Sequence, residues 1–129
     1  MTTHEMSLNT PWWEFVQNGS KIYEGRRATE KVRQILPGDR IVFCHVSHDS
    51  EECDPITVEV VEMLCFPTFQ SALEFLPICD VLPIDGITVA EGVEIYKRYV
   101  SIPTQLKDGV VMIKIKLCDV SAESTHASR

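Results

Sequence analysis

Apolar residues occupy alternate positions along a long run in the middle of the chain. The alternation extends from Ile56 to Val60, shifts its phase by one residue, and continues from Val61 to Cys65. Period-two alternation predicts a β-strand, and a change of phase within one run is typical of a β-bulge. Because barrels use bulges to bend their strands, this run favours a curved, barrel-like sheet.

Three other segments have the character of strands. Residues 41–46 form an apolar run that only His45 interrupts, as in a strand that is buried on both sides or closes a barrel. Residues 21–26 are less apolar and are predicted as a short strand from their context. A last strand follows the turn at Lys107-Asp108-Gly109, with Lys114 and Lys116 facing water. Its inward-facing residues are expected to be Val111, Ile113, Ile115 and Leu117.

The first helix is predicted from a start signal and a stop signal. Thr10 is expected as its N-cap and Pro11 as its first helical residue. Trp12 is expected on the face that is turned toward the core. Gly19 stands where a glycine ends a helix in the left-handed conformation.

Helical spacing returns in three places further along. Residues 27–35 are expected to form one or two turns, with Val32 inward. Residues 69–76 keep the i, i+3, i+4, i+7 spacing of an amphipathic helix. Thr88 and Glu91 have the spacing of a capping box, which predicts another helix. Strands and helices in this order predict an α+β domain.

The remaining segments are predicted as turns, loops and ends. Residues 36–39 carry Pro and Gly at the central positions of a type II turn. Residues 76–85 contain two prolines and are expected to form an ordered loop. Residues 1–7 and 119–129 are expected to be flexible ends, so the predicted domain spans residues 8–118.

The composition excludes several classes of protein. A chain of 129 residues with 44% hydrophobic and 24% charged residues is typical of one globular domain. No apolar run has the length of a membrane span, and the N-terminal residues lack the pattern of a secretory signal. Five cysteines without a Cys-x-x-Cys spacing favour a reducing compartment. We therefore expect no membrane association and a cytoplasmic protein, with the nucleus as the alternative.

A metal site is not expected either. His45, His48 and Cys53 lie close together in the sequence, but their spacing matches no standard zinc site. We expect neither a metal nor a cofactor.

The charge is unevenly distributed along the chain. The formal net charge is −7, which disfavours binding to a long polyanion. Residues 19–40 nevertheless contain six basic and three acidic residues, a net charge of +3, so the rest of the chain carries −10. A single basic segment on an acidic protein suits a small anionic ligand or a short RNA segment.

Residues 19–26 carry the strongest candidate chemistry. Along a strand, alternation directs Glu24 and Arg26 to one face, and Lys21 stands at the entry to the strand. A lysine and an arginine can hold a phosphate or a carbonyl group, and a carboxylate can orient them or accept a proton. From the spacing alone, the alternative is an ordinary solvated strand face.

The spacing Gly19-x-Lys21-x-x-Glu24-x-Arg26 resembles the signature of the ASCH superfamily, named for activating signal cointegrator homology. The resemblance extends from about residue 8 to residue 117 and includes the Pro-Gly-Asp turn at residues 37–39. It implies a PUA-like β-barrel with flanking helices, which is similar to an RNA-binding domain.

The resemblance also implies an enzymatic alternative. One branch of the superfamily hydrolyses N4-acylated cytidines with a catalytic lysine, which Lys21 matches. A threonine of that branch is replaced here by Glu24, and Asp85 lies near the position of a further carboxylate. Glu24 would then have to act as a general base for water. A metal-independent nuclease would use the same residues.

The preferred interpretation is binding of RNA or a nucleotide-like ligand in a cleft around residues 19–27. Lys21, Arg26 and Arg27 would contact phosphate or base edges, and Glu24 would accept from an exocyclic amine. An aromatic residue would stack on a base, and Trp13 is the first candidate. The other aromatic candidates are Tyr23, Tyr96 and Tyr99. For each of the four, the alternative is packing in the core or over the end of the barrel.

A third class of function stays open. A scaffold that binds only another protein agrees with the acidic net charge, which disfavours RNA. For each interpretation we expect the chain to be a monomer.

Overall fold

A computed structural model describes residues 1–46 and 55–118. The predicted tail at residues 119–129, together with His48 and Cys53, lies outside these described residues. The elements in chain order are β1 (Thr3–Leu8), α1 (Trp12–Gln17), β2 (Tyr23–Arg27), α2 (Glu30–Arg33), β3 (Arg40–His45), β4 (Ile56–Phe66), α3 (Phe69–Phe75), α4 (Ile78–Val81), α5 (Val89–Lys97), α6 (Ile102–Asp108) and β5 (Val110–Leu117).

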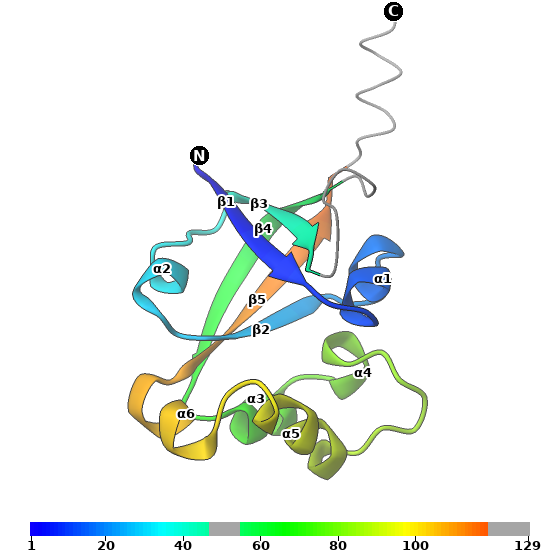
Figure 1. Ribbon diagram of the computed structural model, residues 1–129, viewed down its shortest axis with the longest axis vertical. Coiled ribbons are helices and arrows are strands. Elements are labelled where there is room, and N and C mark those ends of the chain that lie inside the picture. Colours follow the sequence, from blue (N-terminus) through cyan, green and yellow to red (C-terminus); the bar gives the residue numbers. More distant parts are fainter. Residues whose placement is uncertain (47–54, 119–129) are drawn as a thin grey trace, which may run out of the picture.

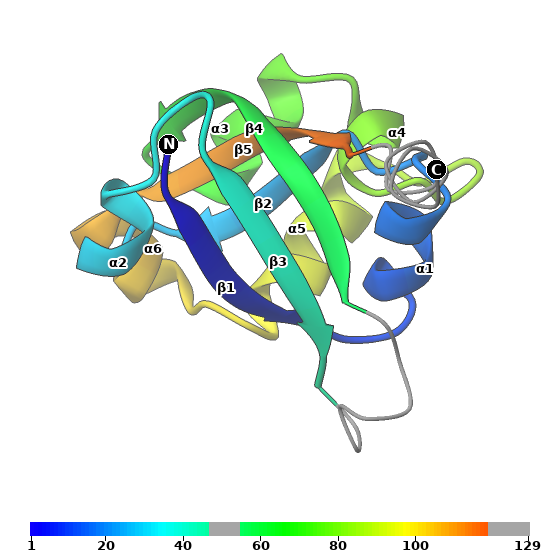
Figure 2. The ribbon, with the colours of Figure 1, turned by 90° about the horizontal axis from the view of Figure 1, so that it is seen from above.

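The strands form one five-stranded sheet in the order β1-β3-β4-β5-β2. β1 runs parallel to β3, and the other neighbouring pairs are antiparallel. The pairing of β4 with β5 shifts its register between Val60 and Glu62, which confirms the predicted bulge. The sheet curls into a half-barrel (Figure 2), so the α+β, barrel-like class is confirmed.

Helices cover the half-barrel in two groups. In Figure 1, α3, α4, α5 and α6 lie together below the strands, whereas α1 and α2 lie beside them. Thr88 and Glu91 form the predicted capping box at the start of α5. The short helices α4 and α6 were not predicted from the sequence. None of the helices in the described part of the chain is long and apolar enough to cross a membrane.

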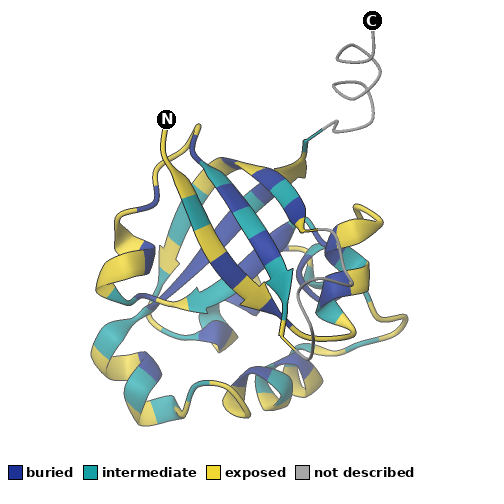
Figure 3. Ribbon diagram, turned by 45° about the horizontal axis from the view of Figure 1, so that its top comes forward, coloured by how far each residue is buried: buried dark blue, intermediate teal, exposed yellow. Residues whose placement is uncertain are grey.

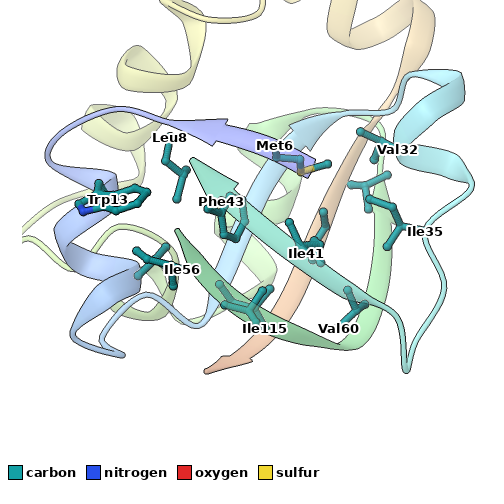
Figure 4. Close-up of a cluster of buried hydrophobic side chains, with 14 of the residues drawn as sticks. Met6, Leu8, Trp13, Val32, Ile35, Ile41, Phe43, Ile56, Val60 and Ile115 are labelled. Carbon is teal, nitrogen blue, oxygen red and sulfur yellow. The ribbon is translucent and has the colours of Figure 1, made fainter. Parts of the chain in front are cut away.

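Buried side chains form two clusters, one on each face of the sheet. Figure 3 shows buried residues alternating with more exposed ones along several strands. The inner cluster includes Ile41, Phe43 and Val58, and its members converge inside the half-barrel (Figure 4). A second cluster around Phe69 and Leu73 packs the helices against the outer face. Because the first half of β5 contributes to both clusters, it is buried on both sides. Leu117, which was expected to face inward, is exposed.

The N-terminal residues correct a prediction. Residues 1–7 were expected to be flexible, but Thr3–Leu8 forms an edge strand of the sheet. Met6 and Leu8 are buried in the inner cluster. The Asp39 carboxylate holds the start of the strand, because it accepts a hydrogen bond from the backbone N–H of Thr2 at 3.0 Å.

The first helix also differs from the prediction. It begins at Trp12, and its N-cap is Pro11 rather than Thr10. As a result Trp13 faces the core and is only 5% exposed, whereas Trp12 is half-buried. Figure 4 shows Trp13 among the core side chains, with Leu8 and Ile56 nearby. Gly19 follows the helix with a φ of 81°, the left-handed conformation that was predicted.

Candidate functional site

A pocket of about 640 Å³ opens between the edge strands β1 and β2. Residues 5–9 of the β1 region form one wall, and residues 24–27 of β2 form the opposite wall. Lys31 of α2 and Trp12 of α1 complete the rim. β1 and β2 are the two edges of the sheet. In a closed barrel these two strands would pair with each other, and here the pocket lies between them.

Three charged side chains converge at this pocket. The Arg26 Nε lies 2.7 Å from Glu24 Oε2, and the Lys21 Nζ lies 3.7 Å from Glu24 Oε1. Lys21 and Glu24 are only 3% and 6% exposed. Strand alternation explains the pair formed by Glu24 and Arg26, and the carboxylate between two cations makes a compact buried charge network.

Lys21 is the most deeply buried of the three. Its ammonium group donates a hydrogen bond to the carbonyl of Val81 at the end of α4 and lies 5.5 Å from the centre of the Trp12 ring. Burial lowers the pKa of Lys21 below its ordinary value, and the nearby Glu24 carboxylate partly opposes this effect. The site therefore holds a lysine whose proton is more easily lost than that of an exposed lysine.

Local backbone contacts place Lys21 in this position. After the turn at Gly19, the backbone N–H of Lys21 donates to the carbonyl of Phe15 at 3.0 Å. The next residue, Ile22, donates to the carbonyl of Asp80 at 2.8 Å. The chain thus passes between α1 and α4 before it enters β2, and the lysine side chain turns inward there.

Aromatic rings form the other surfaces of the pocket. The indole N–H of Trp12 donates to the Tyr99 hydroxyl at 3.1 Å, and Tyr99 is 57% exposed. Phe69 and Tyr96 stack with their ring centres 4.0 Å apart and an interplanar angle of 7°. Burial raises the pKa of Tyr96, so its hydroxyl stays protonated.

Basic side chains outnumber acidic ones around the pocket. Its lining includes four basic residues, Lys21, Arg26, Arg27 and Lys31, and two acidic residues, Glu5 and Glu24. The lining thus carries a net charge of +2 on a protein whose net charge is −7. This local reversal of sign favours an anionic ligand.

The structure brings some of the predicted site residues together and separates others. Lys21, Glu24, Arg26 and Arg27 line the pocket, as do Tyr96 and Tyr99. Gly19 does not line the pocket. Asp85 is exposed in the loop between α4 and α5 and does not line it.

The prediction that Trp13 and Tyr23 lie in the cleft is wrong. Trp13 belongs to the inner cluster, and Tyr23 is buried in the outer cluster against the helices. Neither residue lines the pocket. The lining also contains Trp12, Lys31 and the β1 wall, which were not predicted from the sequence. A signal for β1 was present, because Met6 and Leu8 alternate with polar neighbours.

No group of three or more His, Cys, Asp or Glu side chains that could hold a metal ion occurs within residues 1–46 and 55–118. His45 contacts the Trp13 ring edge-on, with ring centres 5.2 Å apart, and lies 3.1 Å from the Thr10 hydroxyl. It therefore takes part in packing at the end of β3.

Comparison with known proteins agrees with this architecture. The family model of the ASCH domain matches residues 6–119. The crystal structure of hypothetical protein PH0355 is 32% identical, with a TM-score of 0.78, and the match covers 91% of this chain and all of that one. The solution structure of protein PF0455 from Pyrococcus furiosus is 30% identical, with a TM-score of 0.71 and coverage of 92% and 99%. No curated protein matches the chain.

The fold and the pocket therefore define a PUA-like protein with a buried charged cleft between two sheet edges. The chain belongs to the ASCH domain family.

Proposed function

We propose that the pocket binds a segment of single-stranded RNA or a nucleotide-like ligand. The observation that supports this most directly is the buried network of Lys21, Glu24 and Arg26 beside exposed aromatic surface. A volume of about 640 Å³ lies within the range typical of small-molecule sites. Single-stranded bases are recognised by hydrogen bonds to their edges and by stacking on aromatic rings.

Each part of the pocket has a role in this proposal. Tyr99 and Trp12 provide the stacking surface, because both residues line the pocket and Tyr99 is largely exposed. Arg26 and Arg27 provide positive charge for the sugar-phosphate backbone. Glu24 accepts a hydrogen bond from an exocyclic amine of the base.

Hydrolysis of an amide on a modified nucleoside, such as an N4-acylated cytidine, is the second candidate. It is favoured by one observation, the lowered pKa of Lys21 that results from its burial. Glu24 would act as the general base for water. Asp85 has no part in this version, because it lies outside the pocket.

A titration tests the binding proposal. Single-stranded RNA hexanucleotides of mixed sequence and the four nucleoside monophosphates would be added while tryptophan fluorescence is followed. We expect Arg26→Ala to weaken binding about ten-fold or more, and affinity to fall as salt is raised. Lys97→Ala is the matched control, because Lys97 is an exposed cation on α5 that does not line the pocket.

Two results would count against the proposal. Absence of binding by all these ligands would contradict it, as would equal affinities for Arg26→Ala and Lys97→Ala. The enzymatic candidate has its own assay, turnover of N4-acetylcytidine by the purified protein. It requires that Glu24→Gln, checked for folding, abolishes the turnover.

A further inference from the structure

The exposed edge of β1 has an unusual set of hydrogen bonds. The carbonyl of Ser7 accepts a hydrogen bond from the Arg26 guanidinium at 2.7 Å. The carbonyl of Glu5 accepts one from the Lys31 ammonium group at 2.8 Å. Two cations from the opposite side of the pocket therefore occupy the acceptors of this edge.

The same two residues, Glu5 and Ser7, also carry backbone donors on this edge. The carbonyls of Thr2 and Leu8 accept hydrogen bonds on the β3 side. Successive residues of a strand point their backbone groups to opposite sides, so those of Glu5 and Ser7 point away from β3. In an extended strand, the N–H and C=O of one residue point to the same side. The N–H groups of Glu5 and Ser7 therefore point toward the pocket together with their carbonyls.

A free strand edge normally presents donors and acceptors in alternation, which suits another strand. Here the acceptors at Glu5 and Ser7 are already taken, and each N–H lies beside a cation. An incoming peptide strand would need those two carbonyls and would have to displace Arg26 and Lys31. An anion needs only donors and positive charge.

From this arrangement we propose that the β1 edge is a phosphate-binding edge, in which the N–H groups of Glu5 and Ser7, flanked by Lys31 and Arg26, hold phosphate oxygens of the ligand. The proposal rests on the proposed function and identifies which part of the ligand faces β1. Two residues of a strand span about 6.6 Å, so two neighbouring phosphates of one RNA strand or a single phosphate group fit the same edge.

The position of the edge agrees with the rest of the pocket. In Figure 1, α1, which carries Trp12, and α2, which carries Lys31, lie on opposite sides of the strands, and Tyr99 is hydrogen-bonded to Trp12. A flat ring beside Trp12 and a phosphate beside Lys31 would therefore occupy separate parts of the pocket. The net charge of +2 among the lining residues complements a phosphate. Arg27 pairs with Asp108 at 2.8 Å, whereas Arg26 is the arginine whose guanidinium group donates to the β1 edge, at the Ser7 carbonyl.

A proline substitution isolates the backbone donor. Ser7→Pro removes the N–H of residue 7, and edge strands tolerate proline where the N–H does not belong to the ladder. Thr3→Pro is the matched control, because the N–H of Thr3 also points away from β3 but Thr3 does not line the pocket. We expect Ser7→Pro to weaken binding of cytidine monophosphate or of an RNA hexanucleotide about ten-fold relative to Thr3→Pro.

A second measurement uses the unchanged protein. The amide signals of Glu5 and Ser7 would be followed by nuclear magnetic resonance during titration with cytidine, cytidine monophosphate and an RNA hexanucleotide. We expect shifts with a phosphate-bearing probe and little change with cytidine. Shifts with the monophosphate identify a nucleotide as a sufficient ligand, and shifts with the hexanucleotide alone identify RNA.

The outcomes separate this inference from the function on which it rests. If Arg26→Ala loses binding while Ser7→Pro binds like Thr3→Pro, and the two amide signals stay in place, the phosphate edge is wrong and the binding function stands. Equal shifts with cytidine and its monophosphate would also overturn it. If no nucleotide or RNA binds to the wild-type protein, the proposed function fails first.

Discussion

The backbone of Gly25 lies directly against the hydroxyl group of Tyr96. A Cβ atom on residue 25 would stand 2.7 Å from the Tyr96 oxygen and 3.0 Å from a ring carbon of Phe69. The stack of Phe69 on Tyr96 holds both rings in place. Position 25 of β2 thus needs a glycine, because the floor of the pocket leaves no space for a side chain.

Gly25→Ala is therefore expected to destabilise the protein by about 1–3 kcal/mol, the usual cost of overpacking. Urea denaturation at neutral pH measures the change. Because the closest atom is the hydroxyl oxygen, adding Tyr96→Phe should restore part of the lost stability. Unchanged stability of Gly25→Ala would mean that the contact is looser than the structure has it.

The two adjacent tryptophans should respond differently to the same substitution. Trp12→Phe removes the hydrogen bond to Tyr99 and the ring beside the Lys21 ammonium group, so it should weaken ligand binding and change stability little. Trp13→Phe shrinks a residue of the inner core that is 5% exposed. It should cost about 1–2 kcal/mol in unfolding free energy and leave binding intact.

Thermal denaturation and the RNA titration would be measured on both variants. A binding defect in Trp13→Phe as large as that in Trp12→Phe would place the ligand elsewhere.

The charged network could be predicted because it is local in sequence. Glu24 and Arg26 are two residues apart on one strand, which fixes them on the same face. Lys21 precedes Glu24 by three residues and follows the turn at Gly19. The alternation of apolar residues likewise predicted the long strand with its bulge, and the capping-box spacing predicted helix α5.

The walls of the pocket depend on contacts that are distant in sequence. β1 pairs with β3 in parallel, with Thr3 opposite Arg40. Parallel strands need a long connection, so the sequence contains no hairpin turn that would predict this pairing. The assignment of Trp12 and Trp13 depended on where the helix begins, because one residue turns a helix face by about 100°. The carbonyl of Val81 is a backbone group and leaves no signal in the side-chain pattern.

Glu24 is expected to be essential for stability as well as for the site. Glu24→Gln removes the negative charge between Arg26 and Lys21, and loss of one partner of a buried pair costs about 3 kcal/mol. Glu94→Gln is the control, because its exposed ion pair with Lys97 should contribute less than about 1 kcal/mol. Similar unfolding free energies for the two variants would contradict the buried character of the network.

Acid should loosen the N-terminal strand through Asp39. The hydrogen bond from His4, together with those from the N–H groups of Thr2 and Leu36, lowers the pKa of Asp39 from 3.8 to about 2. A carboxylate with a lowered folded-state pKa stabilises the fold fully above its unfolded pKa. That contribution disappears as the pH falls from about 4 to about 2. The sign follows because the unfolded chain binds the proton more readily than the folded chain does.

Asp39→Asn should therefore lower stability at neutral pH and flatten the acid limb of the stability curve between about pH 4 and pH 2. Unfolding free energy measured across this range, with Asp85→Asn as an exposed control, checks the prediction. Because β1 forms one wall of the pocket, Asp39→Asn should also weaken ligand binding at neutral pH, although Asp39 does not touch the ligand site. If the unfolding free energy of Asp39→Asn falls as steeply between about pH 4 and pH 2 as that of the wild type, another carboxylate is responsible for the acid sensitivity.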